Sequence, residues 1–183
     1  MATKPLTGEQ IEELKGLGET HFWPHSRPTG DMSDDTGIKL VTHSEGIWVE
    51  GPTGERHVDL ISGMWLKNIG HGRKEITEAV AKQLEQLDYC QPFQQGFGGS
   101  FELATKIARH TPGNLNRIFY TICGSTAVET AIKISVAYHR AKGDSQRFRF
   151  IGRERGYHGM NIGATSVGGM VNNIKTFASI LMP

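Results

Sequence analysis

The stretch that most limits the fold of this chain is residues 117–133, where a short apolar run breaks at Gly124 and a helical pattern begins at once. This order predicts a β-strand, a tight turn and a helix N-terminus. The first N–H groups of a helix have no partner within it, and they point outward at the positive end of its dipole. Ser125 adds a hydroxyl at the cap position, and Gly124 removes the side chain that would keep an anion away. The turn therefore predicts a phosphate-binding site.

The same turn also fits simpler interpretations. It can be a helix cap that binds no ligand. Cys123, at the start of the helix, can be a nucleophile with a lowered pKa or a small residue that lines the strand end, and we prefer the second. The turn lacks the Gly-x-x-x-x-Gly-Lys pattern of nucleotide-binding loops, the Gly-x-Gly-x-x-Gly dinucleotide pattern and the Gly-x-Ser-x-Gly nucleophile pattern. The kind of phosphate compound has to come from the rest of the chain.

Composition limits the class of partner. The chain has 20 Lys and Arg against 19 Asp and Glu, a net charge of +1, which favours neither nucleic acid nor an anionic membrane. Glycine accounts for 23 of the 183 residues, which indicates many sharp turns or close approaches to a ligand. Cys90 and Cys123 form neither a metal-binding spacing nor a disulfide framework, and no stretch resembles a signal peptide or a membrane span. We expect a soluble, cytoplasmic protein.

Residues 1–62 predict part of a small domain. It begins with a helix and ends with three short β-type runs separated by turn residues, which predict an antiparallel meander. The expected elements are a helix that starts at the Thr7–Gln10 capping box and ends by Gly16 or Gly18, an ordered loop at 21–35, and strands at 38–42, 47–50 and 57–61.

Residues 63–183 alternate between helical and strand patterns. The expected elements are helices at 74–89, from 100 onward and at 125–142, strands at 117–122 and 147–151, and a loop at 153–159. This order predicts a three-layer α/β domain with a mainly parallel sheet, whose ligands lie beyond the strand C-termini. Because two parallel strands rarely close a core, the sequence looks like the first part of a larger domain.

A second ligand-binding pattern, Gly156-Tyr-His-Gly159, follows the second predicted strand. In a parallel sheet it reaches the same edge as the turn at Gly124. Tyr157 and His158 can place an aromatic face and an imidazole against a planar ring, although a surface turn with a half-buried tyrosine fits as well. Together, the two motifs predict a site for a phosphorylated aromatic cofactor.

Other clusters are weaker candidates. No His, Cys or Asp group has metal-ligand spacing, so we expect no metal site. Trp65, Tyr89 and Phe93 can line a pocket or pack in a core. Four arginines fit either an acid-recognition site or an exposed strand face, and we prefer the second. They are Arg147, Arg149, Arg153 and Arg155.

Three long motifs in this order resemble the class III pyridoxal-phosphate aminotransferases. The closest resemblance is to the ω-amino acid:pyruvate branch, such as the β-alanine:pyruvate transaminases, which share the stretch from Ala137-Tyr-His-Arg-Ala141 through Gly156-Tyr-His-Gly159 to Ser166-Val-Gly-Gly169. The motifs are Gly63-Met-Trp-Leu-Lys-Asn-Ile-Gly-His-Gly-Arg73, Cys123-Gly-Ser-Thr-Ala-Val-Glu-Thr-Ala-Ile-Lys133 and Arg153-Glu-Arg-Gly-Tyr-His-Gly159. The resemblance covers nearly the whole chain. It implies fold type I, pyridoxal 5'-phosphate as cofactor, transfer of an amino group from an ω-amino acid or amine to pyruvate, and a homodimer or higher homo-oligomer with the site at the subunit interface.

The resemblance also implies roles for individual residues. Gly124, Ser125 and Thr126 hold the cofactor phosphate, Tyr157 stacks on the pyridine ring and His158 lies beside it. Substrate-pocket roles fall on Phe22, Trp23, Trp65, Tyr89 and Phe93. The chain departs from many members in two places, since Thr126 replaces an acidic residue and Ile122 a polar one. The Thr126 hydroxyl can still donate to a phosphate.

No catalytic residue is expected within these 183 residues. In the family, the lysine that forms the Schiff base, the aspartate at the pyridine nitrogen and an arginine for the substrate carboxylate lie downstream of the Tyr-His-Gly motif. Neither Lys67 nor Lys133 matches that lysine, so the chain alone should be inactive. The alternatives are a pyridoxal-phosphate decarboxylase or aminomutase of the same fold, and a non-catalytic anion-binding domain.

The stacking role can be tested by comparing two variants of the full-length protein. Tyr157→Ala should weaken cofactor binding more than Thr126→Ala, because loss of a stacked ring removes more contact than loss of one hydroxyl. The measurement is a cofactor titration followed by absorbance. Equal retention of cofactor by both variants would contradict stacking by Tyr157.

Overall fold

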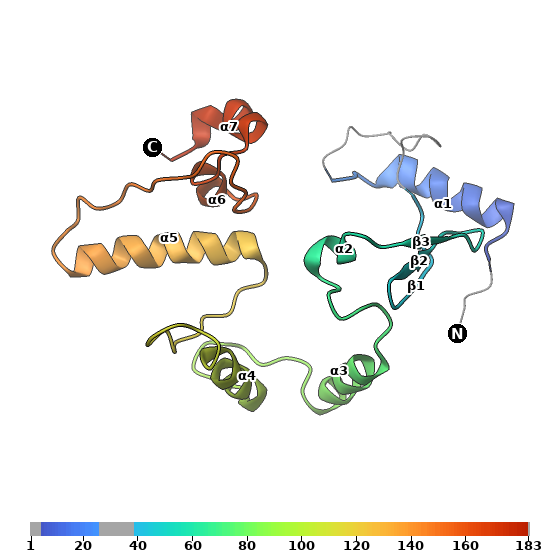
Figure 1. Ribbon diagram of the computed structural model, residues 1–183, viewed down its shortest axis with the longest axis horizontal. Helices are drawn as coiled ribbons and strands as arrows, with labels where there is room; N and C mark the ends of the chain where they lie inside the picture. Colours follow the sequence, from blue (N-terminus) through green and yellow to red (C-terminus); the bar gives the residue numbers. More distant parts are fainter. Residues whose placement is uncertain (1–4, 26–38, 183) are drawn as a thin grey trace. The chain divides into compact units, whose positions relative to one another are not determined.

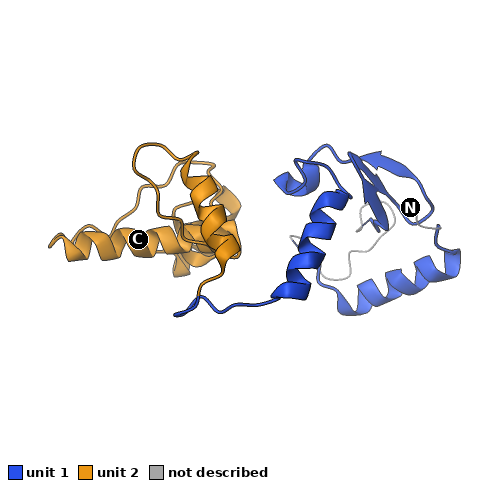
Figure 2. Cartoon of the chain, turned by 90° about the horizontal axis from the view of Figure 1, so that it is seen from below, with its two compact units in different colours: residues 1–95 blue, residues 96–183 orange. Residues whose placement is uncertain are grey.

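The computed structural model describes residues 5–25 and 39–182 (Figure 1). The chain forms two compact units, Met1–Gln95 and Gly96–Pro183, which Figure 2 colours separately. Residue 38 and most of the loop expected at 21–35 lie outside the described residues. The predicted division into domains 1–62 and 63–183 refers to the complete protein. The two units do not test it, and it stays a prediction.

Helix α1 (Gly8–His21) begins at the predicted capping box. The Thr7 N–H donates to Gln10 Oε1 at 2.9 Å, and the Gln10 N–H donates to Thr7 Oγ1 at 3.3 Å. The expected end at Gly16 or Gly18 is wrong, because the helix continues to His21. An interior glycine costs only about 1 kcal/mol relative to alanine and does not by itself end a helix.

A three-stranded antiparallel sheet follows, in the order β1 (His43–Glu45), β2 (Trp48–Glu50), β3 (Arg56–Val58). Val49 of β2 lies opposite Ser44 of β1 and His57 of β3. The predicted meander is confirmed, but its strands are shorter than expected and β1 begins after the expected range 38–42. Residues 39–42 are not a strand, although the Thr42 N–H donates to the Glu50 carbonyl at 2.9 Å.

A left-handed turn follows the sheet at α2 (Ser62–Trp65). The backbone angle φ is positive at four consecutive residues, from +49° at Ser62 to +71° at Trp65, which is unfavourable for residues with a Cβ. Asp59 Oδ2 accepts the Gly63 N–H at 2.7 Å and lies 2.9 Å from His71 Nε2. The aspartate therefore ties the start of the turn to the chain beyond it, and no sequence pattern predicted this conformation.

The remaining predicted helices are confirmed with shifted ends. They are α3 (Lys74–Gln86), α4 (Gly98–Ala108) and α5 (Gly124–Ala141). Three short elements were not predicted from the sequence: α6 (Ile162–Ser166), α7 (Val171–Phe177) and the 3₁₀ turn η1 (Ala178–Ile180). Of the helices in residues 5–25 and 39–182, none is long and apolar enough to cross a membrane.

The strands predicted at 117–122 and 147–151 are not formed in this structure. The side chain of Ile122 is 94% exposed and that of Ile151 fully exposed. A strand needs a neighbour to pair its N–H and C=O groups, and within the described residues the paired strands belong to the small antiparallel sheet. The prediction of these strands was therefore wrong for the structure as it stands.

The tightest packing of unit Gly96–Pro183 lies where α6 meets the N-terminal half of α5 (Figure 1). Ile132 is the buried residue of α5, and Ala164 and Thr165 are among the buried residues of α6. Large side chains elsewhere on α5, such as Tyr138, are exposed. The α5–α6 contact is therefore the best-defined tertiary feature of this unit.

The Asp59–His71 pair predicts an acid-dependent loss of stability. The hydrogen bond from His71 holds the pKa of Asp59 below its ordinary value of 3.8. The carboxylate therefore stabilises the fold above pH 3.8, and this contribution is lost as the pH falls through the lowered pKa. Asp59→Asn should lower the thermal midpoint near neutral pH and flatten its decline between about pH 5 and pH 2. Asp88→Asn, at an exposed aspartate beyond α3, is the control, and equal acid sensitivity of Asp59→Asn and the parent protein would contradict the role.

Candidate functional site

A cavity of about 380 Å³ lies at the N-terminus of α5. Its walls come from two segments that are far apart in the sequence, the first turn of α5 and the loop after residue 156. The lining residues are Gly124, Ser125, Val128, Tyr157, His158 and Gly159. Four of the five predicted cofactor-binding residues therefore share one cavity.

The helix side of the cavity has the chemistry of an anion site. The first N–H groups of α5, an 18-residue helix, have no partner within the helix. A Cβ placed on Gly124 would meet nothing within 4 Å, so the approach to these donors is open. The donors and the positive end of the helix dipole fit a phosphate group.

Thr126, the fifth predicted residue, does not line the cavity. Its hydroxyl lies 3.1 Å from the Cys123 Sγ. This side-chain hydrogen bond, supported by the Thr126 and Ser125 N–H groups, lowers the pKa of the exposed Cys123 thiol. A phosphate contact from Thr126 stays a prediction.

The loop side of the cavity is fastened to α5 through Ser125. The Met160 N–H donates to Ser125 Oγ at 3.0 Å. Gly159 is buried, its φ is +127°, and a Cβ at this position would lie 2.6 Å from Ser125 Oγ. Only glycine fits this backbone conformation and this contact. Tyr157 and His158 therefore lie beside the N-terminus of α5, and their side chains are exposed.

Two backbone hydrogen bonds close the base of this loop. The Arg155 N–H donates to the Gly169 carbonyl at 2.9 Å, and the Gly169 N–H donates to the Gly156 carbonyl at 2.8 Å. The two ends of the loop, at residues 155–156 and 169, therefore lie side by side. Side chains of α5 hold its outer part, and Ser125 is one of them.

Glu129 is the residue that sequence analysis missed. Its Oε1 accepts the Gly163 N–H at 2.6 Å and the Ala164 N–H at 3.2 Å. Glu129 lies one helical turn after Ser125, so both side chains share one face of α5. That spacing was visible in the sequence, but the partner of the carboxylate was not.

The predicted substrate-pocket residues all belong to unit Met1–Gln95. Trp65 ends the left-handed turn and is 74% exposed. The side chains of Phe22, Trp23, Tyr89 and Phe93 are exposed as well. The structure describes each unit by itself, so the place of these aromatic residues in a substrate pocket stays a prediction.

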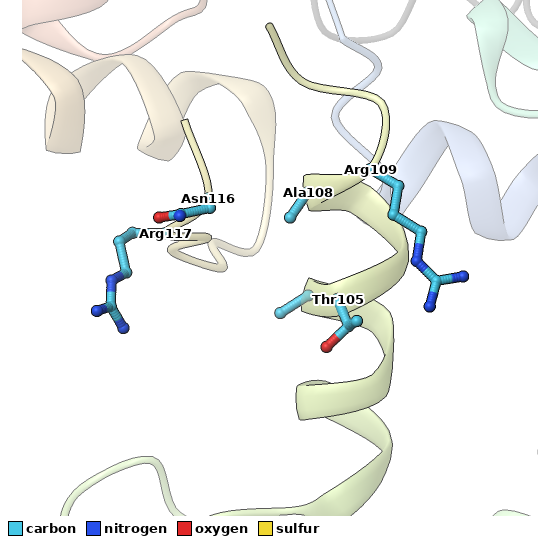
Figure 3. Close-up of a pocket in the computed structure, with 6 residues that line it drawn as sticks. Thr105, Ala108, Arg109, Asn116 and Arg117 are labelled. Carbon is cyan, nitrogen blue, oxygen red and sulfur yellow. The ribbon is translucent and has the colours of Figure 1, made fainter. Parts of the chain in front are cut away.

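A second cavity, of about 520 Å³, contains none of the predicted site residues. It lies between α4 and the segment after it, and Arg109 and Arg117 are among its lining residues. Their guanidinium groups point to opposite sides of the cavity and do not converge (Figure 3). This cavity therefore lacks the clamp that would bind an acid. Across residues 5–25 and 39–182, no group of three or more His, Cys, Asp and Glu side chains is placed to hold a metal ion.

Residues 30–183 match the family model described as aminotransferase class-III. The match covers most of the chain, so the chain belongs to the class III aminotransferases, a family that uses pyridoxal phosphate. The resemblance drawn from the three motifs is confirmed, including its ω-amino acid:pyruvate branch.

Among the relatives, the chain is 45% identical over 159 residues to the omega-amino acid–pyruvate aminotransferase of Pseudomonas putida. This match covers 87% of the chain and 35% of the relative. The omega-aminotransferase of Caulobacter vibrioides is 43% identical, with 78% of this chain and 33% of that protein covered. The chain thus spans about a third of the length of these relatives.

Solved structures agree with the sequence matches. An (S)-enantioselective omega-transaminase from Thermomicrobium roseum aligns with a TM-score of 0.86 at 30% identity, covering 96% of this chain and 38% of that one. The adenosylmethionine-8-amino-7-oxononanoate aminotransferase of Methanocaldococcus jannaschii aligns with a TM-score of 0.88 at 30% identity, covering 94% and 39%. The backbone is therefore that of part of a fold-type I aminotransferase.

The contact of Gly159 with Ser125 can be tested with a matched pair of glycine variants. Gly159→Ala should weaken binding of pyridoxal phosphate by about tenfold, because the new Cβ pushes the loop off the first turn of α5. Gly143→Ala also places a Cβ at positive φ, +87°, but meets nothing within 4 Å. It should cost stability by about 1 kcal/mol and leave cofactor affinity unchanged. Equal affinity of the two variants, measured by titration, would refute the close contact.

Proposed function

We propose that these 183 residues are the N-terminal part of a pyridoxal-phosphate-dependent transaminase that moves an amino group from an ω-amino acid or amine to pyruvate. The observation that carries the proposal is the single cavity that joins the α5 N-terminus to Tyr157 and His158. The names of two Pseudomonas relatives, an omega-amino acid–pyruvate and a beta-alanine–pyruvate aminotransferase, support the donor and acceptor classes. The name of the Caulobacter relative, omega-aminotransferase, supports the class of donor.

The phosphate would bind at the first turn of α5. Ser125 Oγ already accepts the Met160 N–H, so the hydroxyl proton of Ser125 remains available for donation to a phosphate oxygen. The N–H groups of the first turn add further donors at the positive end of the helix. Thr126 would contribute a hydroxyl after it releases Cys123.

The pyridine ring would lie against Tyr157, with His158 beside it. The Tyr157 side chain is 55% exposed and lines the cavity, so a planar ligand can reach its face. When bound, pyridoxal phosphate acts as an electron sink for the substrate carbon. The residues of this chain would hold and orient the cofactor while the lysine that carries the proton comes from outside these 183 residues.

The substrate would be enclosed by aromatic side chains. The residues proposed for this role are Phe22, Trp23, Trp65, Tyr89 and Phe93. We propose a cytoplasmic homodimer or higher homo-oligomer in which part of this pocket crosses the subunit interface. In the complete domain, residues 117–122 and 147–151 would be strands of a mainly parallel three-layer sheet, and the high TM-scores to transaminases support that arrangement.

A transamination assay on the full-length protein tests this proposal. With β-alanine and ¹³C-labelled pyruvate, the expected result is ¹³C-labelled alanine formed in proportion to the β-alanine consumed, measured by chromatography and mass spectrometry. Release of CO₂ would indicate a decarboxylase, and an isomerised amino acid an aminomutase. Cofactor or phosphate binding without any reaction of amino acids or amines would indicate a binding domain and overturn the proposal.

The 183-residue chain alone serves as the control. Treatment with pyridoxal phosphate and borohydride should label no single lysine stoichiometrically, because none of the described residues that line the cavity is a lysine. Stoichiometric labelling at one position would contradict the assignment of the catalytic lysine to residues outside this chain.

A further inference from the structure

Two side chains of α5, a short serine and a longer glutamate, bind the loop that carries Tyr157 and His158. Ser125 holds it at Met160, and Glu129 holds it at Gly163 and Ala164, where α6 begins. Backbone hydrogen bonds at Gly156 and Gly169 also hold the loop, at its base. The outer part of the loop therefore depends on one face of α5.

Glu129 acts as the cap of a helix to which it does not belong. The N-cap residue of α6, Asn161, makes no side-chain capping hydrogen bond. The Glu129 carboxylate accepts two N–H groups there instead, and a charged acceptor forms stronger hydrogen bonds than a neutral one. Without this acceptor, two N–H groups in the buried part of α6 would lose their partner.

The contact is close as well as polar. Gly163 and Ala164 are buried, and Ala164 has no exposed surface. A Cβ on Gly163 would lie 2.6 Å from the Glu129 carboxylate, so the backbone at Gly163 is too close to Glu129 for any side chain to fit between them. The position of the segment before α6 is thus set by the position of the carboxylate.

We infer that Glu129 is a positioning residue for the cofactor site, which rests on the proposed function. By holding α6 against α5, it sets where Tyr157 and His158 stand relative to the phosphate donors of the first helical turn. Glu129 is not among the residues that line the cavity, and it acts through the N–H groups of Gly163 and Ala164.

The test is a set of variants of the full-length protein. Glu129→Ala removes the acceptor, whereas Glu129→Gln retains an amide oxygen that can accept the same N–H groups. Glu102→Ala, at an exposed glutamate of α4, makes the same chemical change away from the loop. Glu129→Ala should weaken pyridoxal-phosphate binding by about tenfold, and Glu129→Gln by no more than about threefold. Glu102→Ala should bind as the parent protein does.

Two readouts separate positioning from general stability. Amide hydrogen exchange over residues 157–164 of the cofactor-free protein should rise in Glu129→Ala and return toward the parent level in Glu129→Gln. The induced circular dichroism of the cofactor, measured at saturation, should fall in Glu129→Ala because Tyr157 no longer stacks in one orientation. A loss of thermal stability with normal exchange and normal dichroism would overturn the inference.

A second variant covers the case in which Glu129→Ala does not fold. Gly163→Ala displaces the carboxylate from the opposite side and should also raise exchange over residues 157–164. Unchanged exchange in Gly163→Ala would overturn the anchoring by Glu129. If the parent protein binds no pyridoxal phosphate, the proposed function fails, and the exchange measurements still decide whether Glu129 holds the loop.

Discussion

The candidate site depends on the hydrogen bonds that hold the 156–164 segment against one face of α5. Ser125 and Glu129 accept three backbone N–H groups from a segment more than 30 residues away. Buried N–H groups are costly to leave unpaired, so these acceptors determine where the segment lies. The helix that presents its N-terminal donors to an anion therefore also positions the aromatic residue expected to cover the ligand.

The left-handed turn in the other unit follows the same principle. Four consecutive residues with positive φ are held by a carboxylate that accepts the Gly63 N–H and pairs with His71. Unfavourable backbone angles persist only where the surrounding contacts outweigh them, and they are frequent at functional sites. Trp65, the residue to which family resemblance gives a pocket role, stands at the end of this turn.

Local patterns predicted the local elements well. The Thr7 capping box and the starts of the helices near residues 74, 100 and 125 depend on neighbouring residues, and they formed where expected. The meander also formed, although its first strand begins at residue 43, after the expected range 38–42. The strands predicted at 117–122 and 147–151 did not form, because a strand needs partners that a local pattern cannot supply. The left-handed turn and α6 were missed because acceptors distant in sequence, Asp59 and Glu129, support them.

The sequence by itself determined the family, the turn and helix start at Gly124, and the residue types at the cavity, since each is written in contiguous residues. Only the tertiary structure decided that Gly124, Ser125, Tyr157 and His158 share one cavity and that Thr126 turns to Cys123 instead. The reason is that hydrogen bonds between distant segments depend on how the chain folds back. Glu129 is the clearest case, because nothing in its local sequence names Gly163 and Ala164 as its partners.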